Sequence, residues 1–148
     1  MSRRARRPPD AAPAGALAVG WATVESDRAA VELAPLLAPG EGFAEAPGSE
    51  TLGASCRIGR AAGSGLRWIV LLEPATEGRL AASLARHGEG WVAAWWARGR
   101  GADGGDPADA AATWSASRPG PFGPERLRVG GPITGPHRLR LDGDTIEP

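Results

Sequence analysis

Residues 66–96, LRWIVLLEPATEGRLAASLARHGEGWVAAWW, carry the clearest succession of secondary-structure signals in the chain. Residues 66–73 are mostly apolar and rich in large side chains, which is typical of a buried strand. Thr76 is then well placed to cap a helix whose leucines lie four residues apart and which ends at Gly88. Residues 91–96 form a second apolar run. This stretch therefore predicts a strand, a helix and another strand.

The chain on either side of this stretch alternates in the same way. Residues 16–24 predict a buried strand, and Ser26 is the expected N-cap of a helix that Pro35 must end or kink. Turn residues separate the remaining expected elements, which are strands at residues 52–59, 126–129, 137–141 and 144–147 and an alanine-rich helix from Pro107 to about Ser115. Helices and strands mixed in this order predict an α+β fold.

Residues 1–15 differ in composition from the rest of the chain. They contain four Arg and three Pro but no large apolar side chain beyond Met1. Because such a segment cannot bury enough surface to offset the entropy of ordering it, we expect a disordered tail. One folded domain is then expected over residues 16–148, a length that can enclose a hydrophobic core.

The overall composition narrows the classes of function. Basic and acidic side chains number 17 each, so the chain lacks the concentrated positive charge of a typical nucleic-acid binder. No apolar run approaches the roughly 18 residues needed to cross a bilayer, and no apolar segment follows the N-terminal arginines as it would in a secretion signal. A single cysteine, Cys56, fits a reducing compartment. We expect a cytoplasmic protein that binds neither nucleic acid nor membrane.

The stretch quoted first also carries a more specific pattern. Leu-Leu-Glu-Pro at residues 71–74 precedes the predicted helix at 76–87, and Gly-Glu-Gly at 88–90 leads into the next strand. This order resembles the vicinal oxygen chelate superfamily, which includes glyoxalase I, methylmalonyl-CoA epimerase, extradiol dioxygenases and the bleomycin-resistance proteins. The resemblance implies paired βαβββ modules that form an incomplete, glyoxalase-like barrel, with one module over about residues 16–87 and the other over 88–148.

Enzymes of this superfamily hold a divalent metal on the concave face of the barrel through His and Glu or Gln side chains. Carried over to this chain, three of the ligand positions fall on Trp21, Val70 and Ala93, whose side chains are not ligands of a catalytic metal. Glu147 remains as a loose match for the last ligand. We therefore expect neither a metal nor another cofactor, and enzymatic activity stays open.

Alternation along the strands predicts which other side chains face the same concave surface. Successive side chains point to opposite faces, so a residue two positions from a ligand position shares its face. The expected ligand-binding set comprises Trp21, Trp68, Val70, Trp91, Ala93 and Trp95. Four indole rings over a small alanine floor suit a flat apolar or cationic molecule. The same rings would also fit a packed core or a homodimer interface, and the sequence leaves these readings open.

Three functions remain open. The first is binding of a small organic molecule in an aromatic-lined concave pocket without a catalytic metal, as in the drug-sequestering members of the superfamily, with pairing as a homodimer. The second is a lyase or isomerase of the same fold, with a displaced metal site or with His137 as the base. The third is a non-catalytic structural or partner-binding protein. We expect Cys56 to be inert because it has no partner histidine, and His87 to complement the dipole of its helix.

Overall fold

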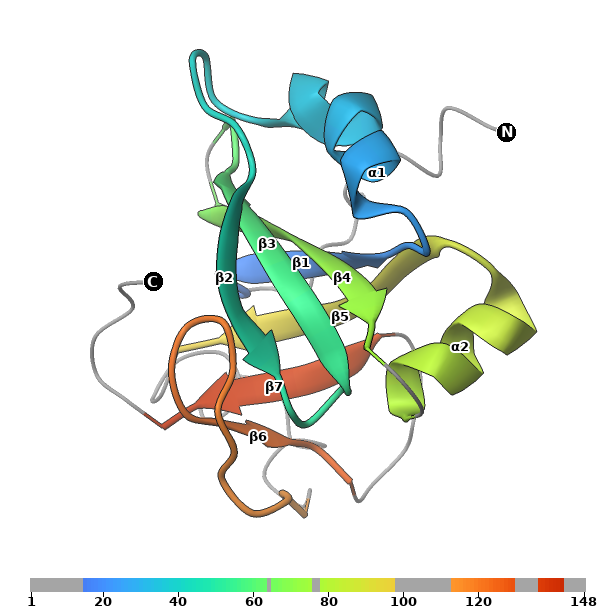
Figure 1. Cartoon of the computed structure of the whole chain (residues 1–148). Helices are drawn as coiled ribbons and strands as arrows, with labels where there is room; N and C mark the ends of the chain where they lie inside the picture. The colour runs from blue at the N-terminus through green and yellow to red at the C-terminus, as the bar shows by residue number, and fades with distance from the viewer. Residues whose placement is uncertain (1–14, 64, 76–77, 98–112, 130–135, 143–148) are drawn as a thin grey trace.

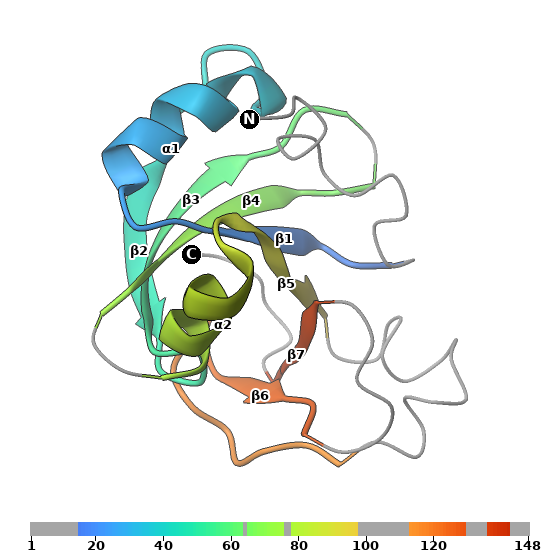
Figure 2. The same ribbon diagram turned by 90° about the vertical axis from the view of Figure 1, so that its right-hand side faces the viewer.

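The structure is a computed structural model that describes residues 15–63, 65–75, 78–97, 113–129 and 136–142. Within these residues, seven strands form one mixed sheet that curls into a half-barrel, with two α-helices packed against it (Figure 1 and Figure 2). The strands are β1 Ala18–Ala22, β2 Ala44–Ser49, β3 Ala54–Arg60, β4 Trp68–Pro74, β5 Gly90–Trp96, β6 Glu125–Leu127 and β7 His137–Leu141, and the helices are α1 Ser26–Leu33 and α2 Arg79–His87. The predicted α+β incomplete barrel is confirmed.

The sheet consists of two halves with the same internal arrangement. Its strand order is β2-β3-β4-β1-β5-β7-β6. The first strand of each half, β1 or β5, runs parallel to the last strand of that half, β4 or β7, and the halves meet where β1 pairs antiparallel with β5. An antiparallel bridge between Trp114 and Arg128 extends the second half past β6. This is the paired arrangement that the resemblance implies.

The predicted helix that ends at about Ser115 differs from the structure over its described part. Residues 113–115 are not helical, and Trp114 instead pairs with Arg128 at the free edge of β6. The guanidinium of Arg140 also lies over the Trp114 ring, 4.8 Å from its centre. These long-range contacts outweigh the helical preference of the alanines before them. Three other predictions lie outside the described residues: the rest of this helix, the strand at 144–147 with Glu147, and the tail up to residue 14.

Both described helices end where the sequence predicts, but Glu25 and not Ser26 occupies the N-cap position of α1. α1 stops at Leu33, and a single 3-10 turn over Ala34–Leu36, which contains the proline, follows it. α2 stops before Gly88, whose φ of 74° lies in the left-handed region that favours glycine. α2 begins later than predicted, at Arg79, and the expected cap Thr76 lies outside the described residues.

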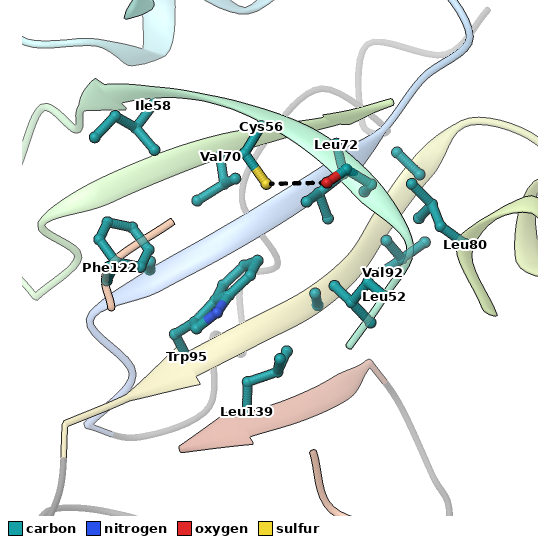
Figure 3. Close-up of a cluster of buried hydrophobic side chains, with 14 of the residues drawn as sticks. Leu52, Cys56, Ile58, Val70, Leu72, Leu80, Val92, Trp95, Phe122 and Leu139 are labelled. Carbon is teal, nitrogen blue, oxygen red and sulfur yellow. Dashed lines mark hydrogen bonds between the residues drawn. The ribbon is translucent and has the colours of Figure 1, made fainter. Parts of the chain in front are cut away.

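The concave side of the half-barrel, called the inner face below, holds the main hydrophobic core (Figure 3). Strands from across the whole sheet contribute to it, and the side chains that point inward include Cys56, Val70, Trp95 and Leu139. Phe122, from the segment before β6, packs against Trp95 in a T-shaped arrangement with ring centres 5.9 Å apart. The inner face is therefore filled by the protein's own side chains.

The convex side, called the outer face below, carries a second layer of packing. α1 covers part of it through Ala29 and Leu33, which pack with Trp21 of β1 and Leu71 of β4. Figure 2 shows α1 on this side of the sheet. Neither of the described helices has the length and apolar character that a membrane span requires.

Residues 118–125, called the closing segment below, connect the two edges of the sheet. The edge strands are β2 and β6. The backbone N–H of Glu50, just after β2, donates to the carbonyl of Pro119 at 3.1 Å, and the Ser49 hydroxyl donates to Oε2 of Glu125 at 2.7 Å. Figure 1 shows this segment, in orange, beside the end of β2. The segment therefore closes the half-barrel across its open side.

Candidate functional site

The structure separates the six predicted ligand-binding residues into two sets on opposite faces of the sheet. The inner-face set comprises Trp68, Val70, Ala93 and Trp95. The outer-face set comprises Trp21 and Trp91, whose rings pack edge to face with centres 5.0 Å apart. Strict alternation predicts that the four indole rings share one surface. The structure instead places two of them on each face.

A β-bulge explains the position of Trp91. Gly20 of β1 lies opposite Ala93 of β5, but the next residue of β1, Trp21, lies opposite Trp91, which leaves Val92 as an extra residue. Val92 and Ala93 both belong to the inner core, whereas Trp91 packs with Trp21 on the outer face. Alternation without a bulge places Trp91 and Ala93 on the same face, so the extra residue reverses the expectation for Trp91.

The predicted residues on the inner face are part of the core. Val70 and Trp95 are 0% exposed, and Ala93 is 1% exposed. Phe122 packs against the half-buried Trp68 and against Trp95, with ring centres 6.2 Å and 5.9 Å apart. The closing segment thus places an aromatic ring of this chain where we expected the ring of a ligand. Binding of a ligand by any of the six residues stays a prediction.

The central strands of the inner face carry small or apolar residues where they pair. Gly20, Val70 and Ala93 are neighbours on β1, β4 and β5, whereas Trp21 lies on the outer face. None of the three side chains contains nitrogen or oxygen. A Cβ atom on Gly20 would lie 2.7 Å from the Leu72 side chain, so the position has no room for a larger residue. Within the described residues, no three or more His, Cys, Asp or Glu side chains come together in a group that could hold a metal ion.

Glu125 places a carboxylate inside the apolar inner face. Its side chain is buried, Oε1 accepts a hydrogen bond from the Trp95 indole Nε1 at 2.9 Å, and Oε2 accepts one from the Ser49 hydroxyl at 2.7 Å. Burial raises the pKa of this carboxyl, and the hydrogen bonds from Trp95 and Ser49 oppose that shift. Both oxygens hold the closing segment in place, so we assign the group a structural role.

Glu125→Gln should raise the thermal stability at neutral pH by several degrees. Because the pKa of Glu125 is higher in the folded state, its contribution to stability is fully present below the unfolded pKa of about 4.3 and is lost as the pH rises through the folded pKa. The amide keeps both hydrogen bonds, since its oxygen accepts from Trp95 and its NH₂ donates to the Ser49 oxygen. Tm measured between pH 4 and pH 8 should show a gain that shrinks towards acid pH. The exposed Glu45→Gln is the control, and a Glu125→Gln variant less stable at neutral pH would contradict this expectation.

A groove of about 500 Å³ lies between α2 and the first residues of β5 and β7. Figure 1 shows α2 beside the starts of both strands. The lining comes from three elements and comprises Arg79, Ala82, Ser83, Arg86 and His87 of α2, Trp91 and Val92 of β5, and Pro136 and His137 at the start of β7. Two residues that the sequence singled out, Trp91 and His137, therefore meet at one groove.

The helical repeat of α2 determines which side chains face this groove. Residues 79, 82, 83, 86 and 87 are spaced as one face of a helix. Leu80 and Leu84 on the adjacent face pack against the inner core. The helix thus turns its leucines to the barrel and its basic and small side chains to the groove. His87, expected only to complement the helix dipole, lines the groove as well.

Within the described part of the chain, the titratable side chains that line the groove are all basic: Arg79, Arg86, His87 and His137. His137 is half-buried, and its pKa is lowered by burial and by the positive charge of Arg79, so its imidazole is mostly neutral at pH 7. The Trp91 Nε1 atom is buried and has no hydrogen-bond partner among the described residues. Trp91 therefore presents ring carbons to the groove, which gives it an apolar wall.

Sequence reasoning found Trp91 and His137 but missed Arg79, Ser83 and Arg86. Their spacing on one face of the predicted helix was visible, because the leucine stripe beside it defines the buried side. The sequence lacked any indication that this exposed face lies beside the starts of two strands. That contact depends on the pairing of β5 with β7, which joins distant parts of the chain.

No protein-family model matches the sequence, and neither does any curated protein. Solved structures match it in fold. Methylmalonyl-CoA epimerase from Mycobacterium tuberculosis superposes with a TM-score of 0.60 at 17% identity, covering 87% of this chain and 89% of that chain. A variant of the Streptomyces coelicolor methylmalonyl-CoA epimerase, in complex with 2-nitronate-propionyl-CoA, gives 0.61 at 16% identity, covering 88% and 99%. A hypothetical protein from Bacillus halodurans gives 0.61 at 14% identity, covering 90% and 97%. This chain therefore has the fold of the vicinal oxygen chelate superfamily.

Proposed function

We propose that this protein binds a small organic molecule without a catalytic metal, in the groove between α2 and the starts of β5 and β7. The groove itself carries the proposal. Its volume of about 500 Å³ is that of a small-molecule site, and it combines the apolar surface of Trp91 and Val92 with polar side chains. The inner face supports the same location indirectly, because Phe122 and Trp95 fill it and its central positions have no metal ligands.

A screen of small molecules for a shift in Tm and a change in tryptophan fluorescence tests this proposal, since Trp91 lines the groove. Acyl-CoA esters are among the first probes, because solved neighbours are complexes with 2-nitronate-propionyl-CoA and with methylmalonyl-CoA. We expect the protein to bind a ligand equally well with and without EDTA. A ligand that binds only after Zn²⁺ or Mn²⁺ is added would contradict the metal-free proposal.

Two matched variants of α2 locate the binding. Ala82→Phe places a ring inside the groove, and Ala85→Phe places the same ring at an exposed position of α2 outside it. We expect Ala82→Phe to weaken binding by about tenfold or more, equivalent to about 1.4 kcal/mol, and Ala85→Phe to leave it unchanged. Equal affinities in the two variants would place the ligand elsewhere.

His137 gives this groove a second candidate function, that of a lyase or isomerase with His137 as the base. A half-buried, neutral imidazole can accept a proton from a bound substrate. The two functions differ in one observable, because an enzyme of this kind would exchange a hydrogen of its ligand with deuterium oxide, which NMR detects. Pairing as a homodimer stays a prediction.

A further inference from the structure

We propose that the ligand of this groove is a small organic acid whose oxyanion group, a carboxylate or a phosphate, is held between Arg79 and His137. Its apolar part lies against Trp91. This inference rests on the proposed function and adds the chemical class of the ligand. Three features of the groove carry it: the sign of its charge, its unpaired arginines and the position of its apolar wall.

The charge of the groove differs from that of the whole chain. Basic and acidic side chains are equal in number over the sequence, at 17 each. Among the described residues, by contrast, the groove is lined by two arginines and two histidines and by no acidic side chain. A concave surface lined by one sign of charge concentrates ions of the opposite sign. The groove therefore selects an anion over a neutral or cationic molecule.

Among the described residues, Arg79 and Arg86 lack the carboxylate partners that an arginine such as Arg28 has. Arg28 of α1 contacts three carboxylates, and the shortest of these contacts, to Glu89, is 2.6 Å. In the part of the chain that the structure describes, neither Arg79 nor Arg86 forms an ion pair. Their guanidinium groups keep their N–H donors for a ligand, and a guanidinium matches the geometry of a carboxylate or a phosphate.

Arg79 and His137 approach the groove from different elements, α2 and β7. They lie close enough for the charge of Arg79 to lower the pKa of His137. An oxyanion placed between them accepts hydrogen bonds from the guanidinium and from an imidazole N–H, and its charge offsets that repulsion. Trp91 and Val92 form the apolar wall, so a bare inorganic anion would leave part of the site uncovered.

Three probes that share one phenylpropyl skeleton test the inference: 3-phenylpropionate, 3-phenylpropyl phosphate and the neutral 3-phenylpropanol, each titrated calorimetrically. We expect at least one of the acids to bind about tenfold more tightly than the alcohol or better, equivalent to about 1.4 kcal/mol. Arg79→Gln should remove this preference. Arg67→Gln, which deletes the same charge at an exposed position outside the groove, should keep it.

Each outcome bears on the inference separately from the proposed function. A preference for one acid over the other supports the inference and identifies the oxyanion. The inference is overturned if neither acid binds better than the alcohol, including the case in which no probe binds, or if Arg79→Gln keeps the preference. In those cases the proposed function still stands if another ligand loses affinity in Ala82→Phe. The proposed function fails only if no ligand binds more weakly to Ala82→Phe than to the unchanged protein.

Discussion

Trp95→Ala is expected to lower the free energy of unfolding by about 3–5 kcal/mol. The Trp95 indole is fully buried at the inner face and packs against Phe122, so its removal leaves a cavity that the surrounding strands cannot fill. The substitution also removes the indole N–H that donates a hydrogen bond to Glu125, so the buried carboxylate keeps fewer hydrogen bonds. Urea unfolding followed by far-UV circular dichroism measures the loss.

Two further variants separate the causes of this effect. Trp95→Phe keeps most of the ring volume but cannot donate a hydrogen bond, so we expect it to cost about 1–3 kcal/mol. Trp114→Ala removes a half-buried indole at the edge of the sheet and should cost less than Trp95→Ala. A loss below about 1 kcal/mol for Trp95→Ala would show that the inner face is not a tightly packed core.

Gly120→Ala is expected to lower the free energy of unfolding by about 1–3 kcal/mol. A Cβ atom at this position would collide with Oε1 and Cδ of Glu125, so the closing segment cannot keep its position. The Glu125 side chain has little freedom to move, because Trp95 and Ser49 both hold it. Thermal unfolding followed by circular dichroism measures the change.

Gly42→Ala is the matched control for this variant. Nothing lies within 4 Å of a Cβ atom at Gly42, and neither Gly42 nor Gly120 has the positive φ that would strain an alanine. We therefore expect Gly42→Ala to change stability by less than about 0.5 kcal/mol. Equal effects of the two substitutions would mean that the contact between Gly120 and Glu125 does not hold the closing segment.

Local sequence patterns were sufficient to predict most of the elements. The apolar runs at residues 66–73 and 91–96 correspond to β4 and β5, and Gly88 ends α2 as expected. Such patterns depend on neighbours in the chain, and a sequence displays these directly. The pairing of the two halves is a long-range property, and we could expect it only from the resemblance to a known superfamily.

The candidate site was harder to predict because it depends on strand pairing. One extra residue, Val92, turns Trp91 to the outer face, and this bulge arises only where β5 pairs with β1. Glu125 posed a different difficulty, since nothing in the sequence around it indicates that its carboxylate is buried against Trp95 and Ser49. Side chains whose roles depend on distant partners have no local pattern.

The closing segment also has a consequence for the order in which the molecule opens. Ser49 and Glu125 are 76 positions apart in the chain, whereas the hairpin of β3 and β4 joins near neighbours. Forming the contact between the sheet edges therefore costs more loop-closure entropy than forming the hairpin. That contact can form last in folding and part first in unfolding, at a free energy below that of global unfolding. Parting of these contacts would admit solvent to the inner face while both halves of the sheet stay folded.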